Sequence, residues 1–289
     1  MIGDQKNHPK ENPLGPFNWR IQRPLALRFG LEAVAIIEAG HYESPLGKSV
    51  DIAALIESAK SGTESYPPDR STPASRRGPW DTVIEIENES TLCAGQRLLR
   101  SDLEPVVLNF ASATEPGGGF LRGARAQEEY LARSSGLYAC LRGNPMYAFH
   151  LEQDDPLYSD YVIYSPGVPV FRDDEGALLE DPYSIGIITS PAVCAVELLP
   201  HEMDEVPEAM RGRIRKVLSI GLLHGHDAIV LGAWGCGAFG NDPRLMARLF
   251  KESIETDFPG AYKRIVFAIV DMWEDRRTIG PFREVFGVG

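Results

Sequence analysis

From about residue 80 to the end of the chain, short β-branched and apolar runs alternate with stretches of amphipathic spacing. The short runs are typical of strands, and the stretches between them repeat apolar residues at helical intervals. Predicted strands cover residues 82–86, 105–110, 161–164, 185–189, 228–231 and 265–270, and predicted helices cover 92–100, 127–141, 207–224 and 243–258. This alternation predicts an α/β sandwich with a largely parallel, buried central sheet. Ligands bind such sheets beyond the carboxyl ends of the strands, so we expect function in the loops that follow strands.

The segment before residue 80 has a different character. Residues 1–21 are rich in Asn, Pro, Lys and Gly and lack an apolar period, which predicts an arm to which we assign no role. Residues 23–39 carry apolar side chains at helical spacing, and a shorter helix is predicted over residues 50–60. A long loop rich in Ser, Pro and Arg follows. We therefore predict an arm with a helical extension over residues 1–79 and a main domain over residues 80–289.

The charge balance narrows the partners that the chain can bind. Its 289 residues include 29 Lys and Arg against 41 Asp and Glu, which gives a formal net charge of −12. Broad nucleic-acid binders concentrate basic residues against phosphates, so direct nucleic-acid binding is not expected. No stretch resembles a membrane helix or a secretory signal, so we expect a cytoplasmic protein with no membrane partner. No exposed apolar stretch or heptad pattern demands a partner chain, and we expect a monomer.

The four cysteines, Cys93, Cys140, Cys194 and Cys236, stand singly in the sequence. They show neither a CxxC spacing nor pairing with His at zinc-ligand intervals, so the sequence predicts no metal and no disulfide framework. Free thiols in a reducing compartment fit this pattern best.

The first unusual loop follows the predicted strand at residues 105–110. It runs from Asn109 through Gly117, Gly118 and Gly119 to a helix that begins Gln127-Glu128-Glu129, eight positions after the last glycine. Glycines let backbone amides approach a ligand, and a helix start adds unpaired amides. An isolated glycine triplet is more often a flexible turn, and acidic residues often begin helices because they complement the dipole. Together, however, they place two adjacent carboxylates at a ligand cleft, where repulsion and burial can raise one pKa towards neutrality.

The second unusual loop follows the predicted strand at residues 228–231. It reads Gly-Ala-Trp-Gly-Cys-Gly-Ala-Phe-Gly-Asn-Asp over residues 232–242, and Pro243 opens the next helix after a capping Asp242 or Asn241. Four glycines in nine residues can form a concave backbone whose amides hold a diphosphate without cationic side chains. The alternative is a glycine-rich turn that serves close packing only.

The glycine triplet followed by Gln127-Glu128-Glu129 resembles the signature of the poly(ADP-ribose) glycohydrolases. The chain length, residues 28–42 and the run Gly-Ala-Trp-Gly-Cys-Gly-Ala-Phe-Gly-Asn are similar to the compact bacterial type, and the resemblance extends from about residue 23 to the end of the chain. It implies a macrodomain-like three-layer α/β/α sandwich with a mixed central sheet and a helical N-terminal extension. It also implies hydrolysis of the ribose–ribose O-glycosidic bonds of poly(ADP-ribose), with no metal or cofactor. The expected partners are ADP-ribose and poly(ADP-ribose), including polymer on modified proteins.

The resemblance also assigns roles to single residues. Glu129 is expected to protonate the leaving oxygen and then, as a carboxylate, to deprotonate the attacking water. Glu128 is expected to bond the ribose hydroxyls at the bond that is cut, Asn109 to bind the terminal ribose hydroxyls, and Gln127 to support the loop or the pyrophosphate. The pyrophosphate is expected between Gly117, Gly118 and Gly119 on one side and Gly235, Cys236, Gly237, Ala238 and Gly240 on the other, with Phe239 against the sugar or base. Cys236 would contribute its amide; we do not expect a catalytic thiol.

Three points remain open in the sequence. The tyrosine-bearing segment of the longer eukaryotic members is not identifiable here, which favours release of terminal units over internal cleavage. Candidate adenine contacts are Phe267, Ile269, Val83 and Ile84, each of which also fits the core. The alternative functions are a macrodomain that binds ADP-ribose without cleaving it, which would have no need of the acid pair, and a hydrolase of a protein-linked mono-ADP-ribosyl bond.

Overall fold

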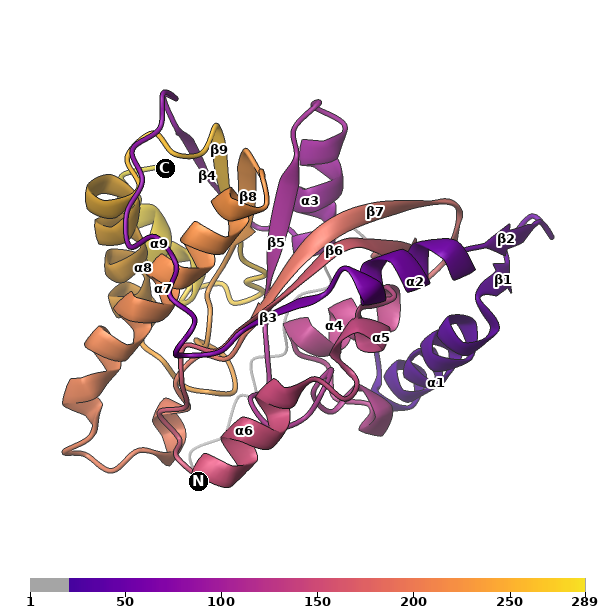
Figure 1. Cartoon of the computed structure of the whole chain (residues 1–289), viewed down its shortest axis with the longest axis horizontal. Helices are drawn as coiled ribbons and strands as arrows, with labels where there is room; N and C mark the ends of the chain where they lie inside the picture. The colour runs from indigo at the N-terminus through magenta and orange to yellow at the C-terminus, as the bar shows by residue number, and fades with distance from the viewer. Residues whose placement is uncertain (1–20, 289) are drawn as a thin grey trace, which may run out of the picture.

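The computed structural model describes residues 21–288, in which seven strands form one mixed sheet (Figure 1). These strands are β3 (Glu64–Tyr66), β4 (Val83–Glu87), β5 (Pro105–Phe110), β6 (Val162–Arg172), β7 (Leu178–Ser190), β8 (Ala228–Leu231) and β9 (Arg264–Ala268). They lie in the order β3-β6-β7-β5-β8-β9-β4. The five strands from β7 to β4 are parallel, whereas β6 pairs antiparallel with both β7 and β3.

Helices cover both faces of this sheet. Because side chains alternate along a strand, Val106 and Leu108 belong to one core and Val107 to the other. The first core lies under α7 (Val206–Leu223), α8 (Pro243–Glu252) and α9 (Ile279–Phe286). The second lies under α3 (Thr91–Leu99), α4 (Gln127–Ser134), α5 (Leu137–Leu141) and α6 (Pro145–Gln153). The three-layer α/β/α sandwich with a mixed sheet is therefore confirmed.

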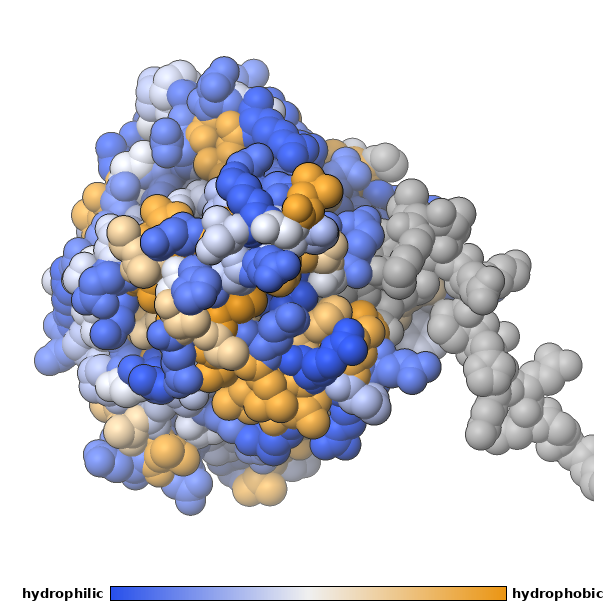
Figure 2. Space-filling view, turned by 90° about the vertical axis from the view of Figure 1, so that its right-hand side faces the viewer, coloured by the Kyte–Doolittle hydropathy of each residue, from blue (hydrophilic) through white to orange (hydrophobic). Residues whose placement is uncertain are grey.

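The N-terminal extension packs on the second helical layer. It contains α1 (Arg23–Ala39), a hairpin of β1 (His41–Glu43) and β2 (Ser49–Asp51), and α2 (Ala53–Ser61). α1 lies so close to the segment after the first glycine loop that a Cβ on Gly30 would meet the carbonyl oxygen of Phe120 at 2.7 Å. Figure 2 looks onto the end of the molecule that carries this extension, where hydrophobic residues are interspersed among hydrophilic ones. The predicted arm, residues 1–21, lies outside the described residues except for Ile21, which is buried.

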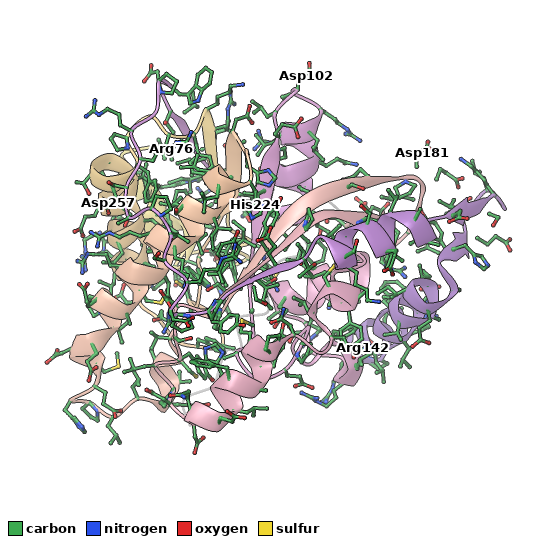
Figure 3. All side chains as sticks on the ribbon, viewed as in Figure 1. Arg76, Asp102, Arg142, Asp181, His224 and Asp257 are labelled. Carbon is green, nitrogen blue, oxygen red and sulfur yellow. The ribbon has the colours of Figure 1, made fainter. Side chains whose placement is uncertain are left out.

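β3 joins the extension to the sheet, since it pairs with β6 at the sheet edge. The hydroxyl of Tyr66 on β3 lies 2.8 Å from Nε2 of His224, whose ring stacks on Tyr164 with centroids 3.6 Å apart. His224 is the C-cap of α7 and is labelled in Figure 3. The strand β3 comes from the segment before residue 80, and yet it is part of the main sheet. The division of the chain at residue 80 stays a prediction.

The sheet is largely parallel, as the alternation predicted, but β6 and β7 form a long antiparallel hairpin that the short predicted runs did not reveal. One predicted helix was wrong. The helix predicted over residues 127–141 is two helices, broken at Ser135. Ser135 is extended, forms a bridge with Val170, and accepts a hydrogen bond from the amide of Leu137 with its hydroxyl, which competes with helix continuation.

The strands β1, β2 and β3 and the helices α6 and α9 were not predicted, and two predicted helices differ at their boundaries. The second predicted helix begins at Ala53 rather than residue 50, because residues 49–51 form β2, and the helix predicted up to residue 258 changes after Glu252 to a π-helical turn (Ser253–Asp257). None of the helices in the described part of the chain is long and apolar enough to cross a bilayer.

Candidate active site

The two glycine-rich loops follow β5 and β8, which are parallel neighbours at the centre of the sheet. Their carboxyl ends therefore meet at one edge of the sheet, as the sequence predicted. A cleft of about 460 Å³ opens there. Of the predicted residues, those that line it are Gln127, Glu128, Glu129, Gly235, Cys236, Gly237, Ala238 and Phe239.

The first glycine loop lies directly against the acid pair. Gly118 has a φ of +59°, and a Cβ placed on it would lie 2.4 Å from Oε1 of Glu129 and 3.0 Å from Oε2 of Glu128. The amide of Gly119 donates to Oε1 of Glu129 at 2.9 Å, while Oε2 of Glu129 is buried and makes no hydrogen bond in the described structure. The glycine triplet therefore lies against the carboxylates of the acid pair. Contact of Gly117, Gly118 and Gly119 with a diphosphate stays a prediction.

Glu128 is held at both oxygens. Its Oε2 accepts from the amide of Ser112 at 2.6 Å, and its Oε1 accepts from Nδ2 of Asn109 at 3.3 Å. Burial, with a smaller contribution from the charge of Glu129, raises the pKa of Glu128 to about 8. Glu128 is thus the carboxyl that burial keeps protonated near neutrality, whereas the sequence analysis expected proton transfer from its neighbour Glu129.

Gln127 and Asn109 both bond to groups beside the acid pair, and of the two only Gln127 lines the cleft. The side chain of Gln127 accepts from the amide of Phe110 at 2.9 Å and donates to the carbonyl of Leu108 at 2.8 Å and to the hydroxyl of Thr91 at 3.1 Å. It therefore ties the start of α4 to the end of β5, in agreement with the predicted support of the loop. Asn109 is fully buried, and its Oδ1 has no hydrogen-bond partner among the described residues.

The second loop requires glycine at both of its ends. Gly235 and Gly240 have φ values of +74° and +70°, and Cβ atoms there would collide with Asn241 and Val196, respectively. Between them, Gly237 and Ala238 are exposed residues, and their amides form no hydrogen bond in the described part of the chain. Two free, adjacent amides are what an anion-binding turn needs.

Cys236 differs from its predicted role. Its amide donates to the carbonyl of Ala233 at 3.1 Å, so it is taken by the turn and is not offered to a ligand. Burial raises the pKa of the Cys236 thiol to about 12, which leaves no appreciable thiolate near neutrality. Phe239 faces the cleft and packs against Tyr158, with ring centroids 6.2 Å apart.

Several cleft residues escaped the sequence analysis. Ser90 and Thr91 at the start of α3, Ser112 in the first loop, and Met272 and Thr278 before α9 all line the cleft. Of these residues, only Ser90 could have been noticed in the sequence, as a serine at the start of a predicted helix. Its hydroxyl caps α3 by accepting from the amide of Cys93.

The candidate adenine contacts divide between cleft and core. Ile269 lines the cleft, whereas Phe267 is fully buried and packs against Phe250 and Phe282. The side chain of Val83 is half exposed, outside the cleft. Within residues 21–288 no group of three His, Cys, Asp or Glu side chains could hold a metal ion.

The three-layer fold, with a cleft at the ends of two central parallel strands, is that of a macrodomain-like protein. Residues 31–173 match the family model described as microbial-type PARG, catalytic domain. The poly(ADP-ribose) glycohydrolase of Thermomonospora curvata bound to the inhibitor ADP-HPD is 45% identical, with 90% of this chain and 99% of that chain covered and a TM-score of 0.85. The enzyme from Deinococcus radiodurans in complex with ADP-ribose is 40% identical, with coverage of 82% and 98% and a TM-score of 0.76.

No curated protein gave a significant match. The chain belongs to the microbial-type poly(ADP-ribose) glycohydrolase family and is therefore a glycosidase.

Proposed function

We propose that this enzyme hydrolyses ribose–ribose bonds of poly(ADP-ribose) with Glu129 as the proton-transferring group, and that it releases ADP-ribose mainly from the chain terminus. The observation that carries the assignment is the unequal bonding of the acid pair. Both oxygens of Glu128 accept hydrogen bonds, whereas Glu129 is held at Oε1 only and keeps Oε2 without a partner. A group that exchanges a proton with substrate needs such an unoccupied oxygen.

The ligand is held by backbone amides rather than by cations. Gly237 and Ala238 are exposed and line a cleft in which Arg125 is the only Lys or Arg among the described lining residues. A cleft of about 460 Å³ suits one nucleotide-sized ligand. Solved relatives that carry ADP-ribose or ADP-HPD support ADP-ribose as the ligand. We place its diphosphate at this loop, with Phe239 against a sugar or base.

The reaction begins with one proton on the acid pair. At neutral pH that proton resides on Glu128 in the free enzyme, because burial raises its pKa to about 8. Ribose hydroxyls that donate to Glu128 stabilise its ionised form, which places the shared proton on Glu129. Oε2 of Glu129 then protonates the departing ribose oxygen as the sugar carbon gains oxocarbenium character. The Glu129 carboxylate next accepts a proton from the attacking water, and ADP-ribose is released.

A cleft sized for a single unit supports release from the terminus. The bound unit supplies binding energy at its diphosphate, remote from the carbon that reacts, and this energy can orient the sugar. The rest of the polymer is the leaving group and extends away from the cleft. Analysis of products from polymers of defined length tests this directly, since internal cleavage would release oligomers early in the reaction.

The substitution Glu129→Gln tests the mechanism. It keeps the size of the side chain and its bond to Gly119 but cannot cycle a proton, so hydrolysis should fall by at least about 10³-fold while ADP-ribose binding persists. Glu115→Gln is a matched control, because Glu115 lies on the same loop but pairs at the exposed surface with Arg122. Hydrolysis by Glu129→Gln at the rate of the control would overturn the assignment.

Two related activities are separated by substrate comparison. A hydrolase of protein-linked mono-ADP-ribose would release ADP-ribose from mono-modified protein as fast as from polymer. A binding module would release it from neither, although it would still bind ADP-ribose. The acid pair supports hydrolysis over binding alone, and the likeness to the glycohydrolases supports polymer as the substrate.

We also place the enzyme in the cytoplasm as a monomer that acts on polymer attached to modified proteins, without direct binding of nucleic acid. The four cysteines are free thiols, which suits a reducing compartment. Size-exclusion chromatography with light scattering tests the monomer.

A further inference from the structure

The residue after the acid pair, Tyr130, is buried and forms part of the cleft wall. Its hydroxyl donates to Oδ1 of Asp174, in the turn that joins β6 to β7. Because this hydroxyl gives its hydrogen to Asp174, its 3.1 Å bond with Ser90 must take the hydrogen from Ser90 Oγ. Ser90 in turn accepts from the amide of Cys93 at 3.1 Å. One chain of hydrogen bonds therefore runs from α3 through Tyr130 to the β6–β7 turn.

The acid pair is thus bracketed by two side chains that bond to the start of α3. Gln127, before the pair, donates to Thr91 at 3.1 Å, and Tyr130, after the pair, accepts from Ser90. Gln127, the acid pair and Tyr130 all lie on α4, which is only eight residues long. A short helix held at both sides of a pair of residues cannot rotate without breaking one of these contacts.

Glu129 depends on that restraint. Its carboxylate has a single hydrogen bond within the described residues, from the amide of Gly119, so the direction of Oε2 follows from the rotation of α4. We propose that Tyr130 and Asp174 are positioning residues, which hold α4 so that Oε2 of Glu129 faces the departing ribose oxygen. This proposal rests on the proposed role of Glu129 in proton transfer.

The surroundings of Asp174 make a carboxylate at this position unfavourable for the stability of the fold. Burial raises its pKa, and no Lys or Arg in residues 21–288 forms an ion pair with it. A buried carboxylate that is stabilised by hydroxyl donors instead of a cation costs stability. Its partner Tyr130 lies in the cleft wall, directly after the acid pair. The unfavourable burial of Asp174 therefore occurs beside the residues whose orientation matters for catalysis.

A second anchor keeps α4 in place when the hydroxyl of Tyr130 is removed. Arg172 on β6 donates to the carbonyl of Arg133 at 3.2 Å, to that of Gly176 at 2.8 Å, and to Glu32 on α1 at 2.7 Å. Its guanidinium also lies over the ring of Phe29. Loss of the Tyr130 hydroxyl should therefore loosen the orientation of the helix without unfolding it.

The test is Tyr130→Phe, with Tyr183→Phe as a matched control. Tyr183 lies on β7 and donates to the carbonyl of Leu92 at 3.2 Å, so its loss removes one hydroxyl that bonds α3 and leaves the bond between Tyr130 and Asp174 in place. We expect kcat for polymer to fall about 10- to 100-fold in Tyr130→Phe, the scale of a small misplacement of a reacting group. KM and the Kd for ADP-ribose should change less than about twofold, and Tm should match that of the control.

Variants of Asp174 supply the rescue. Asp174→Asn keeps an oxygen that accepts from Tyr130 and should retain most of kcat, whereas Asp174→Leu should lose as much as Tyr130→Phe. An equal loss in Asn and Leu would overturn positioning by this hydrogen bond, as would wild-type kcat in Tyr130→Phe or an equal fall in kcat in Tyr183→Phe. If Glu129→Gln is inactive while Tyr130→Phe is unimpaired, only the positioning fails. If Glu129→Gln stays active, the proposed mechanism itself fails.

Discussion

The raised pKa of Glu128 makes a quantitative prediction about stability. The carboxyl titrates at about 8 in the folded protein, against an ordinary value of 4.5. Between these two values the native state holds a proton that the unfolded state has released, so the free energy of unfolding falls as pH rises. The slope is about 1.4 kcal/mol per pH unit, and the whole interval amounts to about 4 to 5 kcal/mol. Glu128→Gln has no carboxyl to ionise and escapes this loss.

The surroundings of Glu128 accommodate glutamine. The amide of Ser112 needs an oxygen acceptor, which Gln supplies with Oε1. The other end of the side chain faces Asn109, whose Oδ1 has no hydrogen-bond partner within the described chain. Rotation of the Asn109 amide presents that oxygen to the new Nε2 donor. The same rotation moves Nδ2 of Asn109 away from Glu128 and Thr189, its two acceptors. The substitution therefore removes the charge at a cost in hydrogen bonding that does not change with pH.

The assay is denaturant unfolding at pH 5, 6, 7, 8 and 9, followed by fluorescence of the buried Trp234. Relative to their difference near pH 4.5 to 5, Glu128→Gln should gain about 3 kcal/mol over wild type at pH 7 and more at pH 8. Glu152→Gln, at an exposed position on α6, is the control and should show no such trend. A stability difference between Glu128→Gln and wild type that does not change with pH would refute the assigned pKa.

Two further substitutions test the loops. Gly118→Ala should lower kcat by at least about 100-fold, because its Cβ would lie 2.4 Å from Oε1 of Glu129. Gly143→Ala is the control: its φ of +81° is also positive but the space around it is open, so it should cost only about 1 kcal/mol of stability and no activity. Equal kcat in the two variants would contradict the contact. Burial raises the pKa of the Cys236 thiol to about 12, so the thiol should take no part in the reaction. Cys236→Ser should retain kcat within about threefold, and treatment with iodoacetamide at pH 7.5 should leave the wild type active. Rapid inactivation through Cys236 would contradict this.

Local pattern was sufficient for the central parallel strands and the helices between them. The strands at residues 105–110 and 228–231 and the helix at residues 23–39 agree with the structure at both ends. These elements bury complete apolar runs or a full helical stripe, so their periodicity is strong. The β6–β7 hairpin was missed in part because many of its outer residues are only half buried and its long pairing depends on the partner strand.

Residue types and spacing predicted which residues meet at the site but not their bonding partners. The acid pair and the second glycine loop do line one cleft. By contrast, the sequence could not indicate that the amide of Cys236 would be consumed by its own turn or that Ser112 would bond Glu128. Such contacts depend on how a loop folds back on a helix, and no periodicity encodes that. The hydrogen bond of Tyr130 could not be predicted for the same reason, since its partner Asp174 lies 44 residues further along the chain.

The spacing between the glycine triplet and the acid pair has a physical explanation in this structure that does not depend on ligand. A buried carboxylate needs N–H donors, and Glu129 obtains one from Gly119, ten residues earlier in the chain. That bond requires the chain to turn back on itself within a single short segment, which it does through the one-turn 3-10 helix at Phe120–Arg122 and the left-handed Gly123. The approach is close enough to exclude any Cβ at Gly118. Glycines and glutamates are therefore one structural unit, in which the amide of Gly119 occupies Oε1 of Glu129 and Oε2 keeps no hydrogen-bond partner among the described residues.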